Sequence, residues 1–339
     1  ATQNPRVINY MDEIIAFVSI LIDKGFAYVS EGDVYFRVTK SNNYAKLANK
    51  TLEDLEIGAS GRTDAETDRK EDPLDFALWK AAKEGEISWE SPWGPGRPGW
   101  HIECSVMATE ILGDTIDIHG GGVDLEFPHH TNEIAQSEAK TGKTFANYWM
   151  HNGFVNVDNE KMSKSLGNFV TVHDMLKTVD GQVLRFFLAT QQYRKPINFT
   201  EKAIHDAEVN LKYLKNTHSL PLTEEVSQAE LQTYLDAFQA AMDDDFNTAN
   251  GVTVLFDMAK WINSGNYDET VKDAFEKILQ VFGIVFEEET LDEDIEKLIE
   301  ERQAARANKD FATADRIRDE LAAQGIKLLD TKEGVRWTR

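Results

Sequence analysis

Cysteine, basic charge and long apolar runs are scarce in this sequence. Cys104 is the only cysteine in 339 residues, which excludes an internal disulfide, fits a reducing compartment and leads us to expect a cytoplasmic protein. No apolar run is long enough to cross a bilayer, so no membrane partner is expected. The 36 basic residues stand against 59 acidic ones, a net charge of −23. Because nucleic-acid-binding proteins usually carry a basic surface, an RNA partner would need a local basic patch on an acidic body.

A basic excess appears only near the C-terminus, from Arg302 onward. Nine basic residues there stand against six acidic ones, a net charge of +3, and the preceding segment 286–301 is strongly acidic. On composition alone, we interpret this tail as a solvated helix face of mixed charge.

The hydrophobic patterns divide the chain into an α/β part and a helical part. The α/β part includes a helix at 6–24, a hairpin at 27–38 and a helix at 100–112 that ends at Gly113. Residues 46–75 are polar and irregular, which predicts a long surface excursion.

Glycine and proline mark the ends of the next predicted elements. Residues 114–125 predict a buried strand that runs into a Gly-rich turn, and residues 127–142 predict a helix with Pro128 at its first position. After about residue 200, four successive helical patterns with short polar joints predict an antiparallel bundle. Residues 326–339 predict a small hairpin.

The word KMSKS, Lys161 to Ser165, places two lysines three residues apart in a loop. Nucleotidyl transfer builds negative charge on the departing pyrophosphate, and mobile ammonium groups can stabilise that charge. The five-residue word resembles the KMSKS signature of class I aminoacyl-tRNA synthetases. We therefore take Lys161 and Lys164 as candidate catalytic residues, with Lys164 also contacting ATP.

The stretch DIHGGGVDL carries a glycine triplet at the end of a predicted strand. Backbone without side chains allows close approach of a ligand, so Gly121 and Gly122 are candidate adenosine contacts. Asp124 could accept hydrogen bonds from ribose hydroxyls. The alternative is a tight turn that needs positive φ, and the nearby KMSKS word favours adenosine binding.

A metal site is the third candidate. His129 and Glu133 are spaced i, i+4 on a predicted helix and so share a face. Imidazole nitrogen and carboxylate oxygen are zinc donors, and the thiolate of Cys104 is a good third. Trp100 lies four residues before Cys104 and would form an indole wall beside the metal. The alternatives are a surface hydrogen bond for the pair and core packing for the cysteine.

Together the words GWHIECS, KMSKS, HGGGVDLEFPHH and NKDFATADRIRDELAAQGI resemble the bacterial cysteinyl-tRNA synthetases, a class I family. The resemblance runs from Asn4 to the C-terminus. It implies ATP-dependent activation of L-cysteine, with magnesium, to an adenylate and transfer to tRNA(Cys). It also implies an active-site zinc that binds the substrate thiolate and rejects serine. The ligands carried over are Cys104, His129 and Glu133, and Trp100 matches the tryptophan of the amino-acid pocket.

The same resemblance implies a domain order and a monomer. It predicts a Rossmann-like catalytic domain followed by a helical bundle and a C-terminal anticodon-binding module. The predicted segments are 1–25 (a helix of a truncated Rossmann half), 26–98 (a connective insertion), 99–185 (the second Rossmann half with the zinc site and the KMSKS loop), 186–289 (stem contacts and helical bundle) and 290–339 (the anticodon module).

For the RNA, the resemblance favours the basic tail as a partial contact surface. Trp337 could stack on a base. The candidate phosphate contacts are Arg302, Arg306, Arg316, Arg318 and Arg336.

The sequence departs from the family pattern in three places. A second zinc cysteine and the HIGH signature are absent, and Thr131 stands where the family usually has glutamate. Because the chain opens on ATQNPRV without a starting methionine, we expect that an N-terminal part is missing. Catalysis by this chain alone is then in question.

Three other interpretations stay open. The first is a ligase that joins cysteine to an amino sugar and lacks an anticodon module, which residues 290–339 argue against. The second is a non-catalytic tRNA-binding fragment with vestigial sites. The third is an acidic helical scaffold in which the motifs arose by chance.

Overall fold

The structure is a computed structural model, and the chain divides into two compact units, Ala1–Ile284 and Val285–Arg339. The residues that it describes are 1–50, 69–163, 165–224, 226–286, 293–331 and 334–338. No helix within these ranges has both the length and the apolar character that crossing a membrane requires.

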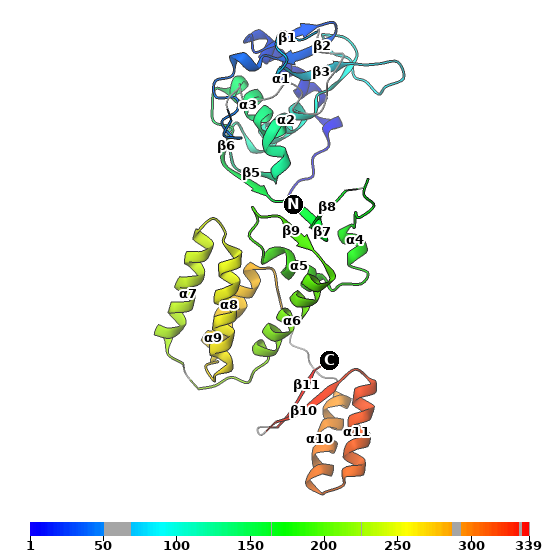
Figure 1. Ribbon diagram of the computed structural model, residues 1–339, viewed down its shortest axis with the longest axis vertical. Coiled ribbons are helices and arrows are strands. Elements are labelled where there is room, and N and C mark those ends of the chain that lie inside the picture. The colour runs from blue at the N-terminus through cyan, green and yellow to red at the C-terminus, as the bar shows by residue number, and fades with distance from the viewer. Residues whose placement is uncertain (51–68, 164, 225, 287–292, 332–333, 339) are drawn as a thin grey trace. The chain divides into compact units, whose positions relative to one another are not determined.

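A four-stranded antiparallel sheet follows the first helix of the chain (Figure 1). Glu31 and Gly32 form the turn of the predicted hairpin with positive φ, which confirms that prediction. The strands lie in the order β1 (Ala27–Ser30), β2 (Asp33–Phe36), β3 (Phe76–Ala81) and β4 (Gly96–Pro98).

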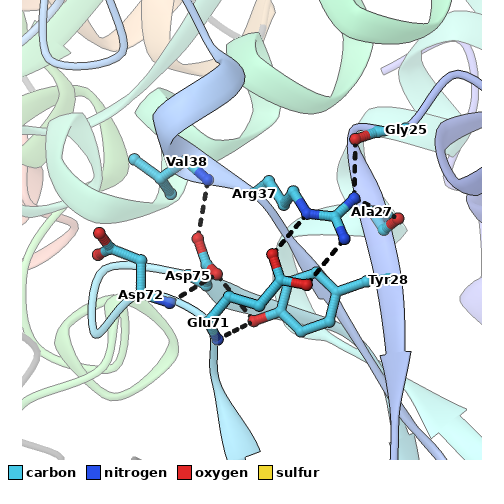
Figure 2. A network of polar contacts seen from close by, with 8 residues as sticks. All are labelled: Gly25, Ala27, Tyr28, Arg37, Val38, Glu71, Asp72 and Asp75. Atoms are coloured by element: carbon cyan, nitrogen blue, oxygen red, sulfur yellow. Dashed lines mark hydrogen bonds and ion pairs between the residues drawn. The ribbon is translucent and has the colours of Figure 1, made fainter.

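A polar network fastens the segment before β3 to this sheet (Figure 2). Arg37 donates to both carboxylate oxygens of Glu71, at 2.6 and 2.8 Å. The Tyr28 hydroxyl donates to Asp75 at 2.8 Å, and Asp75 accepts from the backbone N–H of Val38. The network therefore anchors the end of the predicted surface excursion, of which residues 51–68 lie outside the described part.

Three helices position the candidate site. The predicted helix at 6–24 is observed as a short 3-10 turn, η1 (Val7–Asn9), and α1 (Met11–Asp23). Helix α2 (Trp100–Leu112) confirms the prediction and ends at Gly113, which has φ 93°. Both α1 and α2 pack against α3 (Thr131–Thr141). Their shared core includes Phe17, Ile102, Val106 and Ala135.

Strand β5 (Ile116–Gly122) pairs in parallel with β6 (Ala146–Asn152). The prediction of a buried strand is wrong, because only Ile116 of β5 is buried. The prediction of a Gly-rich turn at residues 120–122 is wrong as well. These glycines extend the strand, in register with Met150 to Asn152, and none has positive φ. Ladder hydrogen bonds to β6 hold them extended, and the chain turns only afterwards, in η4 (Val123–Leu125).

Helix α3 also begins later than predicted. Phe127 has extended backbone angles, φ −139° and ψ 132°, because a residue before proline is disfavoured in the helical region. The π-helical segment η5 (Glu126–His130) leads into α3 at Thr131. The helix ends at Gly142 in the left-handed conformation, close to where glycine predicted its end.

A small sheet carries the KMSKS loop. Strand β7 (Val155–Val157) pairs antiparallel with β8 (Glu160–Lys161) and parallel with β9 (Ile197–Phe199). Two helices, α4 (Val172–Met175) and α5 (Gly181–Ala189), lie between β8 and β9 in the chain.

The four predicted helices after residue 200 are present (Figure 1). Thr200, Asn247 and Asp268 accept hydrogen bonds as N-caps, which explains where three of them begin. They are α6 (Glu201–His218), α7 (Gln228–Asp243), α8 (Thr248–Asn263) and α9 (Glu269–Val281).

The second unit pairs two helices with a hairpin. Helices α10 (Glu293–Ala307) and α11 (Phe311–Ala323) precede β10 (Lys327–Thr331) and β11 (Gly334–Thr338). The two strands pair antiparallel, which confirms the predicted hairpin, and its turn residues 332–333 lie outside the described part. The core is built from Ile295, Ile299, Ile317, Leu321 and Ile326.

Candidate active site and metal centre

The structure brings the three predicted metal ligands together. Cys104 projects from α2, whereas His129 and Glu133 come from η5 and α3. One potential ligand atom from each lies within 4.8 Å of the other two. His129 Nε2 lies 2.8 Å from Glu133 Oε1, as the i, i+4 spacing predicts. His129 and Glu133 are buried and Cys104 is half-buried.

Two further histidines surround Glu133, and the sequence reasoning missed them. His119, in the middle of β5, places Nε2 3.2 Å from Glu133 Oε2. His119, His130 and Glu133 form a second group of donors within 4.8 Å of one another. In the sequence, His119 directly precedes the glycine triplet. Placing its side chain beside Glu133 requires the pairing register of β5 with β6, which the sequence does not give.

Five of the eight histidines of the chain gather in this region. His101 Nδ1 lies 2.7 Å from His129 Nδ1, and His130 Nδ1 lies 2.8 Å from His151 Nε2. The Trp149 ring contacts His119, His130 and His151. The site therefore has a wall of imidazole and indole rings.

Burial and charge set the ionisation of these groups. Burial, reinforced by the carboxylates of Glu133 and Glu103, raises the pKa of the Cys104 thiol to about 12. Burial alone would raise the pKa of Glu133, but the imidazoles of His119 and His129 outweigh it and lower that pKa to about 2. Burial lowers the pKa of His130 to about 4. The protein alone thus holds a neutral thiol beside a carboxylate and a neutral imidazole.

This donor set fits a zinc ion. Both oxygens of Glu133 are buried and, among the described residues, neither has a hydrogen bond, although two imidazole nitrogens lie nearby. Buried polar atoms are normally hydrogen-bonded, so a buried carboxylate that makes no hydrogen bond with the described residues, and only lies within ion-pair distance of two imidazoles, indicates an absent partner. Thiolate sulfur, imidazole nitrogen and carboxylate oxygen are the ligands that zinc takes in proteins. A cation also reverses the electrostatics that keep the thiol protonated.

Trp100 lies beside these residues. Its ring stacks on His129 with 4.2 Å between centroids, and its side chain is 56% exposed. The indole therefore covers His129 on one side and is open to solvent on the other.

Two of the three glycines of β5, Gly121 and Gly122, are crowded by protein atoms. A Cβ on Gly121 would lie 2.8 Å from His130 Cε1 and 2.9 Å from Leu125 Cδ1. A Cβ on Gly122 would lie 2.5 Å from Asp124 Oδ1, on an exposed side chain. Packing of His130 thus gives Gly121 a structural reason to be glycine, besides the predicted approach of a nucleotide.

The KMSKS loop is described only in part. Lys161 is exposed on β8, with Nζ 5.1 Å from the centre of the Phe154 ring. Asn168 braces the loop, because its side chain accepts from Ser163 N and donates to Lys161 O. Lys164 lies outside the described residues.

Most described arginines of the C-terminal tail are paired within the second unit. Arg302 is 5% exposed and donates two hydrogen bonds of 2.9 Å to Asp330. Its guanidinium group is therefore buried and paired, which argues against the prediction that it contacts a phosphate. Trp337 packs against the apolar core of the unit. The side chain of Arg336 lies outside the described part. The other ion pairs are Arg306–Asp330, Arg316–Glu320, Arg318–Asp315 and Arg318–Asp319.

Three family models match the chain. Residues 1–209 match the tRNA synthetases class I (C) catalytic domain. Residues 237–287 match the DALR domain, and residues 288–337 match the cysteinyl-tRNA ligase anticodon binding domain.

Curated relatives are similar over the whole chain. A cysteine–tRNA ligase of Streptococcus thermophilus is 99% identical over 339 residues, which are 100% of this chain and 76% of that protein. Cysteine–tRNA ligases of Streptococcus agalactiae and Streptococcus pyogenes are 80% and 81% identical over the same shares.

Solved structures show the fold. Methionyl-tRNA synthetase of Mycobacterium tuberculosis in complex with methionyl-adenylate aligns with a TM-score of 0.55 at 14% identity, covering 83% of this chain and 71% of that one. Its apo form aligns with a TM-score of 0.51 at 12% identity, over 83% and 71%.

Proposed function

The chain belongs to the cysteine–tRNA ligase family of class I aminoacyl-tRNA synthetases, and we propose that its described residues form the part of the active site that selects cysteine. Cysteine, ATP and tRNA are the substrates that this family membership implies. The proposal concerns which residues act and how.

Cys104, His129 and Glu133 would hold a zinc ion. The support is their convergence together with the carboxylate of Glu133, which is buried and without a hydrogen bond among the described residues. When bound, zinc supplies a centre that prefers a thiolate to a neutral hydroxyl group. Serine and cysteine differ little in shape and an apolar pocket separates such analogues weakly, so this preference provides the discrimination.

The other residues orient the reactants. Trp100 forms a wall of the amino-acid pocket beside His129 and limits access of water. Asp124 accepts hydrogen bonds from ribose hydroxyls, and Gly121 and Gly122 let the nucleotide approach the edge of β5. Lys161 and Lys164 neutralise the charge that develops on pyrophosphate as the cysteine carboxylate attacks the α-phosphate of ATP with magnesium bound.

For the tRNA, we propose stem contacts and the bundle in residues 186–289 and the anticodon module in 290–339, after a catalytic part made of 1–25, 26–98 and 99–185. The split of the chain near residue 284 and the match of 288–337 to an anticodon-binding family support this division. That match also counts against a ligase for amino sugars. A monomer and a cytoplasmic location, the latter resting on the single cysteine, complete the proposal.

One observation carries the proposal: the only thiol of the chain lies within 4.8 Å of His129 and Glu133 donor atoms. The test is cysteine-dependent ATP–pyrophosphate exchange and bound zinc, measured on the full chain and on Cys104→Ser. Thr109→Val is the matched control, because Thr109 lies further along α2 and, among the described residues, its hydroxyl donates only to the backbone of its own helix.

Any exchange should depend on cysteine and not on serine, and we expect a loss of zinc and of that exchange in Cys104→Ser alone. Equal exchange with serine, or full zinc content in Cys104→Ser, would contradict the assigned selection. If the chain binds zinc through Cys104 but shows no exchange, the result supports the assigned metal ligands and contradicts the catalytic roles assigned to Lys161 and Lys164 in this chain.

A further inference from the structure

A buried hydrogen bond joins the two helices that carry the metal ligands. Ser105 Oγ on α2 donates to Gln136 Oε1 on α3 at 2.7 Å, and both side chains are fully buried. We propose that Ser105 and Gln136 are positioning residues that set the distance between Cys104 and the pair formed by His129 and Glu133. This inference rests on the metal site proposed above.

The bond lies within one helical turn of Cys104 on α2 and of Glu133 on α3. Ser105 follows Cys104 directly in the chain. His129, Glu133 and Gln136 are spaced i, i+4, i+7 and so share one face of the helical segment. Gln136 is three residues beyond Glu133, about 4.5 Å along the axis at the rise of an α-helix. A shift of α2 against α3 therefore changes this hydrogen bond and the ligand distances together.

The apolar contacts between α2 and α3 do not fix the distance between the metal ligands as precisely as a metal site requires. Ile102 and Val106 of α2 and Ala135 of α3 belong to the core that the helices share with α1. Apolar burial is non-directional, so it favours contact without selecting one register. A metal site needs ligand distances within about 0.2 Å. The hydrogen bond supplies the direction and length that apolar burial lacks.

The Gln136 amide has no other use in the described part of the chain. Its Nε2 is buried without a hydrogen-bond partner there, so the contact with Ser105 is the polar tie that holds this side chain. Among the described residues, the one hydrogen bond of this amide reaches α2, the helix that carries Cys104. This is expected of a residue that sets the distance between the two helices.

The experiment uses the full chain and Co²⁺ as the probe, because a thiolate bound to Co²⁺ gives a charge-transfer absorption that reports the bond to Cys104 Sγ. The variants are Ser105→Ala, Gln136→Met and the double variant, with Thr109→Val as control. Thr109 also has a buried hydroxyl on α2, but in the described part of the chain this hydroxyl bonds only within that helix. Urea midpoints of the metal-free proteins measure stability separately.

Ser105→Ala should lower the urea midpoint, because it leaves Gln136 Oε1 buried and unpaired, and the double variant should recover it by removing both polar groups. Affinity for Co²⁺ should fall by about tenfold in all three and stay low in the double variant, because the helix that carries Cys104 is then no longer held at ligand distance. This is the lower end of the 10- to 100-fold cost of removing a residue that orients a metal ligand directly. Thr109→Val should keep the wild-type affinity.

Recovery of Co²⁺ affinity together with the urea midpoint in the double variant would overturn the inference, because the bond would then only stabilise the fold. Wild-type affinity in all three variants would overturn it as well. If the wild-type chain itself gives no charge-transfer band, the proposed metal ligands fall, and the inference falls with them.

Discussion

Replacing Gly121 with alanine separates two reasons for a glycine in β5, room for a nucleotide and room for a histidine. The new methyl carbon would lie 2.8 Å from His130 Cε1 and 2.9 Å from Leu125 Cδ1. Carbon atoms pack at about 3.5 Å or more, so both side chains must move by roughly 0.6 Å. Overpacking of this kind costs about 1–3 kcal/mol, and we expect the free energy of unfolding to fall by that amount.

Gly120→Ala is the matched control, because the nearest atoms to its Cβ would be Met150 O at 3.4 Å and Met150 Cβ at 4.0 Å. Its change should stay within about 0.5 kcal/mol. The assay is urea unfolding of both variants without ligand, followed by the apparent KM for ATP. Equal stability of the two variants would refute the packing argument. A raised KM in Gly121→Ala at wild-type stability would assign the glycine to the nucleotide instead.

Three further predictions concern stability. Asp330→Asn removes the charge partner of Arg302 and should destabilise the second unit by about 1–3 kcal/mol, less than the loss at a fully buried pair because Asp330 is 42% exposed. Arg302 holds the pKa of Asp330 below its ordinary value, so this contribution is present at neutral pH and should be lost as pH falls below about 4, as thermal melts between pH 7 and pH 3 would show. Tyr44→Phe leaves the buried Asn132 Oδ1 without its donor and should cost about 1–3 kcal/mol, measured by urea midpoint. Asp268→Ala removes the N-cap of α9 and the acceptor of the Val226 N–H, and should cost about 1–2 kcal/mol in the same assay, whereas an unchanged midpoint would show that neither hydrogen bond contributes.

Local signals predicted most elements of this fold. Helix α2, its end at Gly113 and the four helices after residue 200 depend on periodicity and end signals that lie within the segment itself. The burial of β5 was predicted wrongly, because a strand's exposure is decided by what packs on its two faces. Periodicity alone does not contain that information.

The candidate site shows the same division between local and distant information. The pairing of His129 with Glu133 follows from helical spacing, and the structure shows it. The approach of Cys104 depends on helix packing, and the sequence could suggest it only through a family resemblance. His119 and His151 join the site through the parallel register of β5 and β6, which no short-range pattern specifies.

The ion pairs of the second unit reduce the positive charge that its arginines present to a polyanion. Arg302, Arg306, Arg316 and Arg318 each lie within ion-pair distance of a carboxylate of the same unit. Favourable binding of RNA through charge draws on the release of condensed counterions, and an arginine already neutralised by a neighbour displaces few of them. In the proposed contact with RNA, these ion pairs should therefore make binding less dependent on ionic strength than the number of basic residues in the unit suggests.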